Sequence, residues 1–206
     1  MVTKPFETVQ IFERKIAQFY GAPYAVSTDC CTHAIELSLR YAGKKKVTCP
    51  SRTYVGIPMT LEKLNLDWRF VDENWQDYYY IGNTNIIDAA VYWKSNGYIS
   101  NTFMCLSFQF QKHLNLVRGG AILLDDLDAY QVLKKMSYDG RLPNTVWKEQ
   151  DIDTWGYHYY MTPETAQLGL DKIDSAIKLE PRRQNYSNYP YLPAMKVFNH
   201  DKNTNN

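Results

Sequence analysis

The chain has 206 residues, and its 23 lysines and arginines almost balance its 22 aspartates and glutamates, which leaves a net charge of +1. This length allows one sizeable core, and the balanced charge gives no overall field that would draw the protein to nucleic acid or acidic lipid. The apolar runs are too short to span a bilayer and the start lacks a signal-peptide core, so we expect no membrane partner.

The spacing of apolar residues predicts alternating strands and helices along most of the chain. Helices are expected over residues 5–20, 32–41, 54–64, 127–136 and 163–179. Strands are expected over residues 24–27, 46–49, 68–71 and 85–90, and in two apolar segments on either side of Lys112. Gly21 and Gly43 are typical helix stops. This alternation indicates an α/β fold with a mostly parallel sheet.

In such a sheet, ligands collect at the carboxyl ends of the strands. The residues that follow the expected strands are mostly polar and come from separate parts of the sequence: residues 27–32, 51–54, 88 and 107–112. We therefore expect these four segments to converge on one rim of the sheet.

The stretch from Cys105 to Leu124 predicts a strand, a polar turn that carries Lys112, a glycine pair and a second strand. A lysine held between two buried strands lies close to apolar surroundings. Such surroundings favour the neutral amine, which is the form that attacks a carbonyl carbon. Most lysines beside strands are solvated, so the other residues of the rim decide how this one is interpreted.

Five residues of the rim, together with the helix start at Cys31, suit one cofactor. Cys31 and Thr32 open a helix, where backbone N–H groups and the Thr32 hydroxyl favour a phosphate, and Ser107 adds a second hydroxyl. Tyr54 offers a face on which an aromatic ring can stack, and Asp88 can accept a hydrogen bond from a protonated ring nitrogen. Lys112 can form an imine with an aldehyde. A phosphate, a basic aromatic ring and an aldehyde together describe pyridoxal 5'-phosphate.

Each residue also has an ordinary structural interpretation. Thr32 can be only a helix cap, Asp88 a turn residue, Tyr54 part of the core and Ser107 a hydroxyl at a strand end. The four cysteines lack paired spacing, so we expect free thiols in a reducing compartment, a cytoplasmic protein and no metal site. The occurrence of all five rim residues in this order favours the cofactor site over these separate explanations.

The chain resembles the DegT/DnrJ/EryC1/StrS family of pyridoxal-phosphate sugar aminotransferases. The resemblance runs from about Phe12 to Ile177 and is most specific where Ser107 precedes Lys112 by five positions and a glycine pair follows. The matching segments are residues 12–13, 20–22, 26–35, 49–55, 88–90, 107–112, 119–121 and 156–170.

The resemblance implies a reduced fold-type I structure, a three-layer sandwich, that transfers an amino group from a donor such as glutamate to a keto-sugar nucleotide. It implies that Lys112 forms the Schiff base and moves protons, that Asp88 pairs with the ring nitrogen, and that Tyr54 stacks on the ring. Thr32 and Ser107, next to Cys31, would bind the phosphate. It also implies a homodimer with shared active sites, in which His158 reaches the neighbour's cofactor.

Several positions depart from the family pattern. Val91 and Tyr160 stand where the family has polar groups, and Arg118 replaces a glutamate. Residues 72–88 are too few for an expected strand–helix unit, and the C-terminal small domain is lacking. We expect a cofactor-binding domain over residues 1–180 and an extension over 181–206 whose last residues, 199–206, are disordered. These departures keep open an alternative function as a non-catalytic cofactor-binding homologue that acts as a partner subunit.

Overall fold

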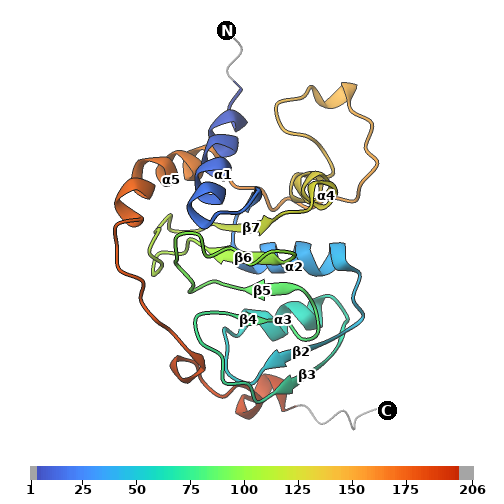
Figure 1. The fold of residues 1–206 in the computed structure, drawn as a ribbon. Helices are drawn as coiled ribbons and strands as arrows, with labels where there is room; N and C mark the ends of the chain where they lie inside the picture. Colours follow the sequence, from blue (N-terminus) through green and yellow to red (C-terminus); the bar gives the residue numbers. More distant parts are fainter. Residues whose placement is uncertain (1–3, 200–206) are drawn as a thin grey trace.

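The computed structural model describes residues 4–199, and its centre is a five-stranded sheet in the order β1-β7-β6-β5-β4, with β2 and β3 as a separate pair (Figure 1). The strands are β1 Tyr24–Thr28, β2 Lys46–Pro50, β3 Asp67–Val71, β4 Tyr79–Tyr80, β5 Ile86–Asp88, β6 Phe103–Ser107 and β7 Gly120–Leu124. Every strand predicted from the sequence is present, and β4 is an addition to that prediction.

The α/β class is confirmed, but the sheet is mixed rather than mostly parallel. Only β5–β6 and β2–β3 pair in parallel, whereas β1–β7, β6–β7 and β4–β5 are antiparallel. The segment between β6 and β7 contains no helix, and a parallel pair needs a long crossover connection. The turn that carries Lys112 therefore reverses the chain, which makes β7 antiparallel to both of its neighbours.

Five helices cover the two faces of the sheet and confirm the expected three layers. They are α1 Phe6–Tyr20, α2 Cys31–Ala42, α3 Gly56–Lys63, α4 Leu127–Ser137 and α5 Pro163–Ala176. Alternate residues of β6 point to opposite faces: Met104 and Leu106 pack in one core cluster with α1 and α5, and Cys105 packs in the other with α2, α3 and α4. This alternation places the sheet between two helical layers.

The helix ends follow local sequence signals. Gly21 and Gly43 adopt left-handed conformations with φ of 75° and 61°, and their N–H groups bond to carbonyls of the last turns of α1 and α2. Helix α5 begins with Pro163 after Thr162, whose side chain accepts a hydrogen bond from the Thr165 N–H. Within residues 4–199, no helix is both long and apolar enough to cross a membrane.

The connection between β3 and β5 contains only the two-residue strand β4 and no helix. It turns back at Gly82, which lies directly against β2: a Cβ there would be 2.5 Å from the backbone nitrogen of Thr48. Strand β4 consequently lies between β5 and the β2–β3 pair, in the space at the lower half of Figure 1. The short β3–β5 connection, with β4, thus takes the place of the strand–helix unit for which residues 72–88 are too few.

After α5, residues 181–199 run back along the molecule, and we call them the C-terminal strap. Asp77 and Gln184 exchange hydrogen bonds of 2.7 and 3.3 Å, and the Leu192 N–H donates to the Ser51 carbonyl at 2.8 Å. Leu192 is fully buried. The part of the chain expected to be disordered, residues 199–206, lies outside the described residues from residue 200 onward.

Candidate functional site

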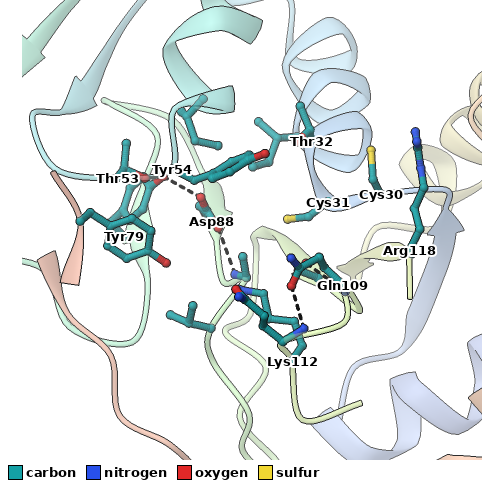
Figure 2. Close-up of a pocket in the computed structure, with 18 of the residues that line it drawn as sticks. Cys30, Cys31, Thr32, Thr53, Tyr54, Tyr79, Asp88, Gln109, Lys112 and Arg118 are labelled. Carbon is teal, nitrogen blue, oxygen red and sulfur yellow. Dashed lines mark hydrogen bonds between the residues drawn. The ribbon is translucent and has the colours of Figure 1, made fainter. Parts of the chain in front are cut away.

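A cavity of about 250 Å³ opens where the carboxyl ends of β5 and β6 meet the N-terminus of α2 (Figure 2). Six of the seven residues predicted for the cofactor site line it: Cys31, Thr32, Tyr54, Asp88, Ser107 and Lys112. The predicted convergence of four chain segments is therefore present in the structure. The role of each residue stays a prediction.

Lys112 lies in the turn between β6 and β7, where its N–H donates to the Gln109 carbonyl at 2.8 Å. The turn is closed by a bond of 2.9 Å from the Phe108 N–H to the Gly119 carbonyl. Within the described part of the chain, the Lys112 amine has neither a hydrogen bond nor an ion pair. Burial lowers the pKa of this amine, and the fields of Cys31 and Asp88 oppose that shift only in part.

Asp88 ends β5 and is buried, with its carboxylate held on both oxygens. Oδ2 accepts a hydrogen bond of 2.6 Å from the Tyr79 hydroxyl, and Oδ1 accepts one of 3.0 Å from the Ala90 N–H. Burial raises the pKa of the carboxyl, while the bonds from Tyr79 and Ala90 and the charge of Lys112 act in the opposite direction. Each oxygen retains a lone pair, so Asp88 can accept a further hydrogen bond from a ligand.

Tyr79, which the sequence analysis missed, links Asp88 to the opposite side of the cavity. Its hydroxyl lies 2.6 Å from the Thr53 Oγ1 as well as 2.6 Å from Asp88, and its ring is buried (Figure 2). The antiparallel register of β4 with β5 sets Tyr79 opposite Asp88. The sequence contained one signal for this arrangement. The connection before Asp88 is too short for the expected strand–helix unit, so another segment had to pack beside Asp88.

The N-terminus of α2 forms the end of the cavity suited to an anion. The N-cap, Cys30, makes no side-chain cap bond, so the first N–H groups of the helix are free to bind a ligand. Gly120 makes this position possible, because a Cβ there would lie 2.5 Å from the Cys31 backbone nitrogen. Gly120 also pairs with Ser107 in the sheet, which brings the serine beside the helix N-terminus.

Tyr54 lies at the open side of the cavity and is 58% exposed, so it is not the core residue of the ordinary interpretation. Its ring edge lies against Gly56 at the start of α3, where a Cβ would approach the Tyr54 ring carbon to 2.7 Å. The same Cβ position lies 3.6 Å from the Thr32 Oγ1. The ring of Tyr54 therefore borders the same space as Thr32, as Figure 2 shows.

His158 is the one predicted site residue outside the cavity. It lies in the long segment after α4, its side chain is 70% exposed, and its Nδ1 is 2.9 Å from the Asp139 carboxylate. The edge of its ring contacts Tyr160. The predicted role of His158 depends on a second copy of the chain, so its distance from this cavity does not test that role.

A group of charged residues that the sequence analysis did not identify adjoins the cavity. One of them, Arg118, lines it, and we call this group the mouth of the cavity. The Asp29 carboxylate lies 2.7 Å from the Arg118 guanidinium and 2.6 Å from the His33 Nδ1. Burial disfavours a charged His33, but the hydrogen bonds and charges of Asp29 and Cys30 together outweigh that effect and raise the pKa of His33 to about 9. Asp29, Cys30 and His33 also place three potential metal ligands within 4.8 Å of one another. Arg118 and a protonated His33 already neutralise the carboxylate, which disfavours a cation there.

Two aromatic residues that the sequence analysis missed complete the side of the cavity away from the sheet: Trp75 from the β3–β4 connection and Tyr189 from the C-terminal strap. Val91 also lines the cavity and contributes only apolar surface. Because Tyr189 follows Asp88 by about a hundred positions, the local sequence gave no signal that they share a site.

Comparisons with known proteins agree with this geometry. The family model described as the DegT/DnrJ/EryC1/StrS aminotransferase family matches residues 1–99 and 87–192. Among solved structures, AtS13 from Actinomadura melliaura is 19% identical with a TM-score of 0.71, and the alignment covers 82% of this chain and 60% of that one. A putative sugar aminotransferase, Spr1654 from Streptococcus pneumoniae in its PLP form, is 19% identical with a TM-score of 0.69 and coverages of 84% and 60%.

A third structure, DesI in the presence of its TDP-sugar product, is 19% identical with a TM-score of 0.64 and coverages of 82% and 53%. The chain thus spans between about half and 60% of the length of these structures. No curated protein matches the sequence. The family model nevertheless covers most of the chain, and the chain therefore belongs to the DegT/DnrJ/EryC1/StrS aminotransferase family, whose cofactor is pyridoxal phosphate.

Proposed function

We propose that this protein binds pyridoxal phosphate in the cavity and transfers an amino group from an amino-acid donor, glutamate, to a keto-sugar nucleotide. The observation that carries the proposal is that one cavity is lined by two titratable groups: the Lys112 amine, which has no hydrogen bond or ion pair among the described residues, and the buried carboxylate of Asp88. Perturbed titratable groups that share a cavity are a common property of active sites.

The residues of the cavity fit this cofactor. The uncapped N-terminus of α2, with Cys31 and Thr32, can hold the phosphate together with Ser107. The exposed ring of Tyr54 can stack on the pyridine ring. Asp88 has a free lone pair on each oxygen for a protonated ring nitrogen. These groups come from different elements yet border the same space.

When bound, pyridoxal phosphate withdraws electrons from the carbon that carries the transferred nitrogen. Lys112 can attach the cofactor through its amine, because burial favours the neutral form of that amine. Once free, the Lys112 amine could accept the proton that leaves the substrate carbon and return it on the other side of the transferred nitrogen. Asp88 stabilises the positive charge on the ring nitrogen while Tyr79 and Ala90 hold its carboxylate in place.

The substrates and the assembly are inferred from the family. DesI is described with a TDP-sugar product, which supports a nucleotide sugar as the acceptor. A homodimer is supported by Trp147 and Trp155, which are 69% and 91% exposed in the segment that leads to His158. In that dimer His158 would reach the partner's cofactor phosphate. The four free cysteines support a reducing, cytoplasmic location.

A second candidate is a protein that binds the cofactor without turnover and serves as a partner subunit. One observation favours it: Val91 contributes no polar group to the cavity. The two candidates differ in one result. Both predict a covalent cofactor on Lys112, but only the aminotransferase converts it with glutamate.

Borohydride reduction after incubation with pyridoxal phosphate, followed by peptide mass spectrometry, tests the proposal. We expect the reduced cofactor on Lys112 in the parent and none at that position in Lys112→Ala. Lys172→Ala is a matched control, because its exposed amine donates to the Asn115 carbonyl away from the cavity. With glutamate, we expect conversion of the cofactor in the parent and at least about a 10³-fold slower reaction in Lys112→Ala.

If the label is absent from Lys112 in the parent, the proposed function is wrong. Labelling of Lys112 without conversion by glutamate or by any other amino acid would instead support the partner-subunit candidate.

A further inference from the structure

The C-terminal strap supplies one residue to the cavity, Tyr189, and several contacts fix its position. Its backbone carbonyl accepts a hydrogen bond of 2.9 Å from the Arg52 guanidinium, and its N–H donates to the Tyr186 carbonyl at 3.1 Å. Its ring packs against Trp75 with 5.4 Å between the ring centroids. Trp75 in turn donates from Nε1 to the Arg52 carbonyl at 2.8 Å. Tyr189 is thus braced by two other segments.

The hydroxyl of Tyr189 differs from the other hydroxyl near Asp88. The Tyr79 hydroxyl is fully engaged by Thr53 and Asp88. The Tyr189 hydroxyl has no hydrogen-bond partner among residues 4–199, although the residue is half-buried and lines the cavity. A phenol that is partly withdrawn from water normally finds a partner. The hydroxyl is therefore available to a molecule that binds in the cavity.

The Tyr189 hydroxyl is influenced by two other residues that line the cavity. Burial, followed by the fields of Asp88 and Cys31, raises the pKa of Tyr189 to about 12. Both of those residues line the cavity, one at the end of β5 and the other at the start of α2. At neutral pH the hydroxyl therefore stays protonated and uncharged, and it can donate a hydrogen bond.

We propose that Tyr189 is a cofactor-binding residue whose hydroxyl donates a hydrogen bond to the ring oxygen of pyridoxal phosphate. This inference rests on the proposed function, since it assumes that the cofactor occupies the cavity. The ring oxygen is the acceptor that gains most from such a donor, because it is negatively charged when the proton lies on the neighbouring nitrogen. The side chain of Val91, an apolar residue that lines the same cavity, cannot supply this bond. The strap therefore completes the site with a residue distant in sequence.

The test compares Tyr189→Phe with Tyr191→Phe, which removes a hydroxyl from the same strap at a residue that does not line the cavity. Tyr189→Phe keeps the ring that packs on Trp75. We expect it to bind pyridoxal phosphate about 10-fold more weakly, as for the loss of one hydrogen bond to a charged oxygen, whereas Tyr191→Phe binds like the parent. Equilibrium dialysis measures the affinity.

A pH titration of the absorbance of the bound cofactor gives a second readout. A donor to the ring oxygen stabilises its anionic form, so its removal should move the absorbance transition of Tyr189→Phe to higher pH. Unchanged affinity and an unchanged transition would overturn the inference. Weaker binding with an unchanged transition would overturn the assignment to the ring oxygen, and an equal effect in Tyr191→Phe would attribute the loss to the packing of the strap. Failure of the proposed function gives a different result, because the parent itself would then lack cofactor on Lys112.

Discussion

The cavity has two sides that differ in origin. The sheet side consists of Thr32, Asp88, Ser107 and Lys112, which follow strand ends or open a helix against the sheet. The outer wall consists of Trp75, Tyr79 and Tyr189, which belong to the short β3–β5 connection and the C-terminal strap. The sheet side was predicted from the sequence, whereas Trp75, Tyr79 and Tyr189 were not.

The two sides also differ in the groups that they provide. The sheet side provides the reactive amine, the carboxylate and the anion-binding helix end, and each needs a defined place at the rim of the sheet. The outer wall provides aromatic surface and hydroxyl groups, which other segments can supply. The two sides meet at Asp88, whose carboxylate is braced by Tyr79 from the outer wall and by its own strand through Ala90.

Among the substitutions considered, Gly120→Ala on the sheet side is expected to lower the stability of the fold most. The new methyl group would lie 2.5 Å from the backbone of both Cys30 and Cys31, so the N-terminus of α2 has to move. We expect the free energy of unfolding to fall by about 3 kcal/mol, near the upper end for overpacking in a core. Urea denaturation measures this change, and cofactor affinity should fall with it because the anion site is displaced.

Gly119→Ala is the matched control for this prediction. A Cβ at Gly119 would meet first the terminal methyl group of Met161, at 3.2 Å, and that flexible side chain can move. We expect a loss below about 1 kcal/mol for this variant. Equal losses for the two variants would mean that the close approach of α2 to β7 does not explain the glycine at position 120.

A smaller effect is expected on the outer wall, from Tyr79→Phe. Removal of the hydroxyl leaves the Thr53 Oγ1 and one oxygen of buried Asp88 without this partner, so we expect a loss of about 2 kcal/mol in stability. It also removes a bond that lowers the pKa of Asp88, so that pKa should rise further. At a given pH less Asp88 is then ionised, and the fall in cofactor affinity on acidification should begin at a higher pH than in the parent.

Cofactor dissociation constants measured across the pH range test the second part of this prediction. Tyr80→Phe is the control, since the neighbouring side chain is 39% exposed and does not line the cavity. An identical pH dependence in Tyr79→Phe and the parent would show that the outer wall does not tune Asp88. The ionisation of Asp88 would then depend on the sheet side alone, and the outer wall would contribute only to the shape of the cavity.

The sequence predicted the sheet side well because local signals determine it. Apolar periodicity placed the strands and helices, and polar residues that end strands or open helices gather at one rim whenever those strands form one sheet. The strand directions were predicted wrongly. Periodicity does not distinguish parallel from antiparallel neighbours, and the short turn at Lys112 was not used to decide the direction of β7.

The outer wall was not predicted, for a physical reason. Tyr79 reaches Asp88 only through the register of a two-residue strand, and Tyr189 reaches the cavity only because the strap is held by contacts such as that between Arg52 and its carbonyl. Such contacts depend on tertiary packing between segments far apart in the sequence. At the mouth, the contact between Arg118 and Asp29 was missed for the same reason. The pair of Asp29 and His33 is local, since the two residues are only four positions apart.

The smallest effect on stability is expected at the mouth. It shows whether the charges around Asp29 stabilise the start of α2. Because the pKa of His33 is raised to about 9 in the folded protein, its protonation stabilises the fold fully below about pH 6.5, and the stabilisation is lost as the pH rises through about 9. Allowing for its partial exposure, we expect a contribution of about 2 kcal/mol or less. Urea denaturation of the parent and of His33→Gln at pH 6 and pH 9.5 measures it, and the difference between the two proteins should be larger at the lower pH.

His158→Gln provides the control for this pH dependence. His158 also contacts an aspartate, Asp139, but its side chain is 70% exposed, so water screens the pair. We expect His158→Gln to follow the parent at both pH values. If His33→Gln also follows the parent, the ion pairs around Asp29 contribute nothing to stability. The charges of the mouth then support neither side of the cavity. If only His33→Gln departs from the parent, two features stabilise the start of α2. Gly120 leaves room for its close approach to β7, and the charges around Asp29 hold it at the mouth.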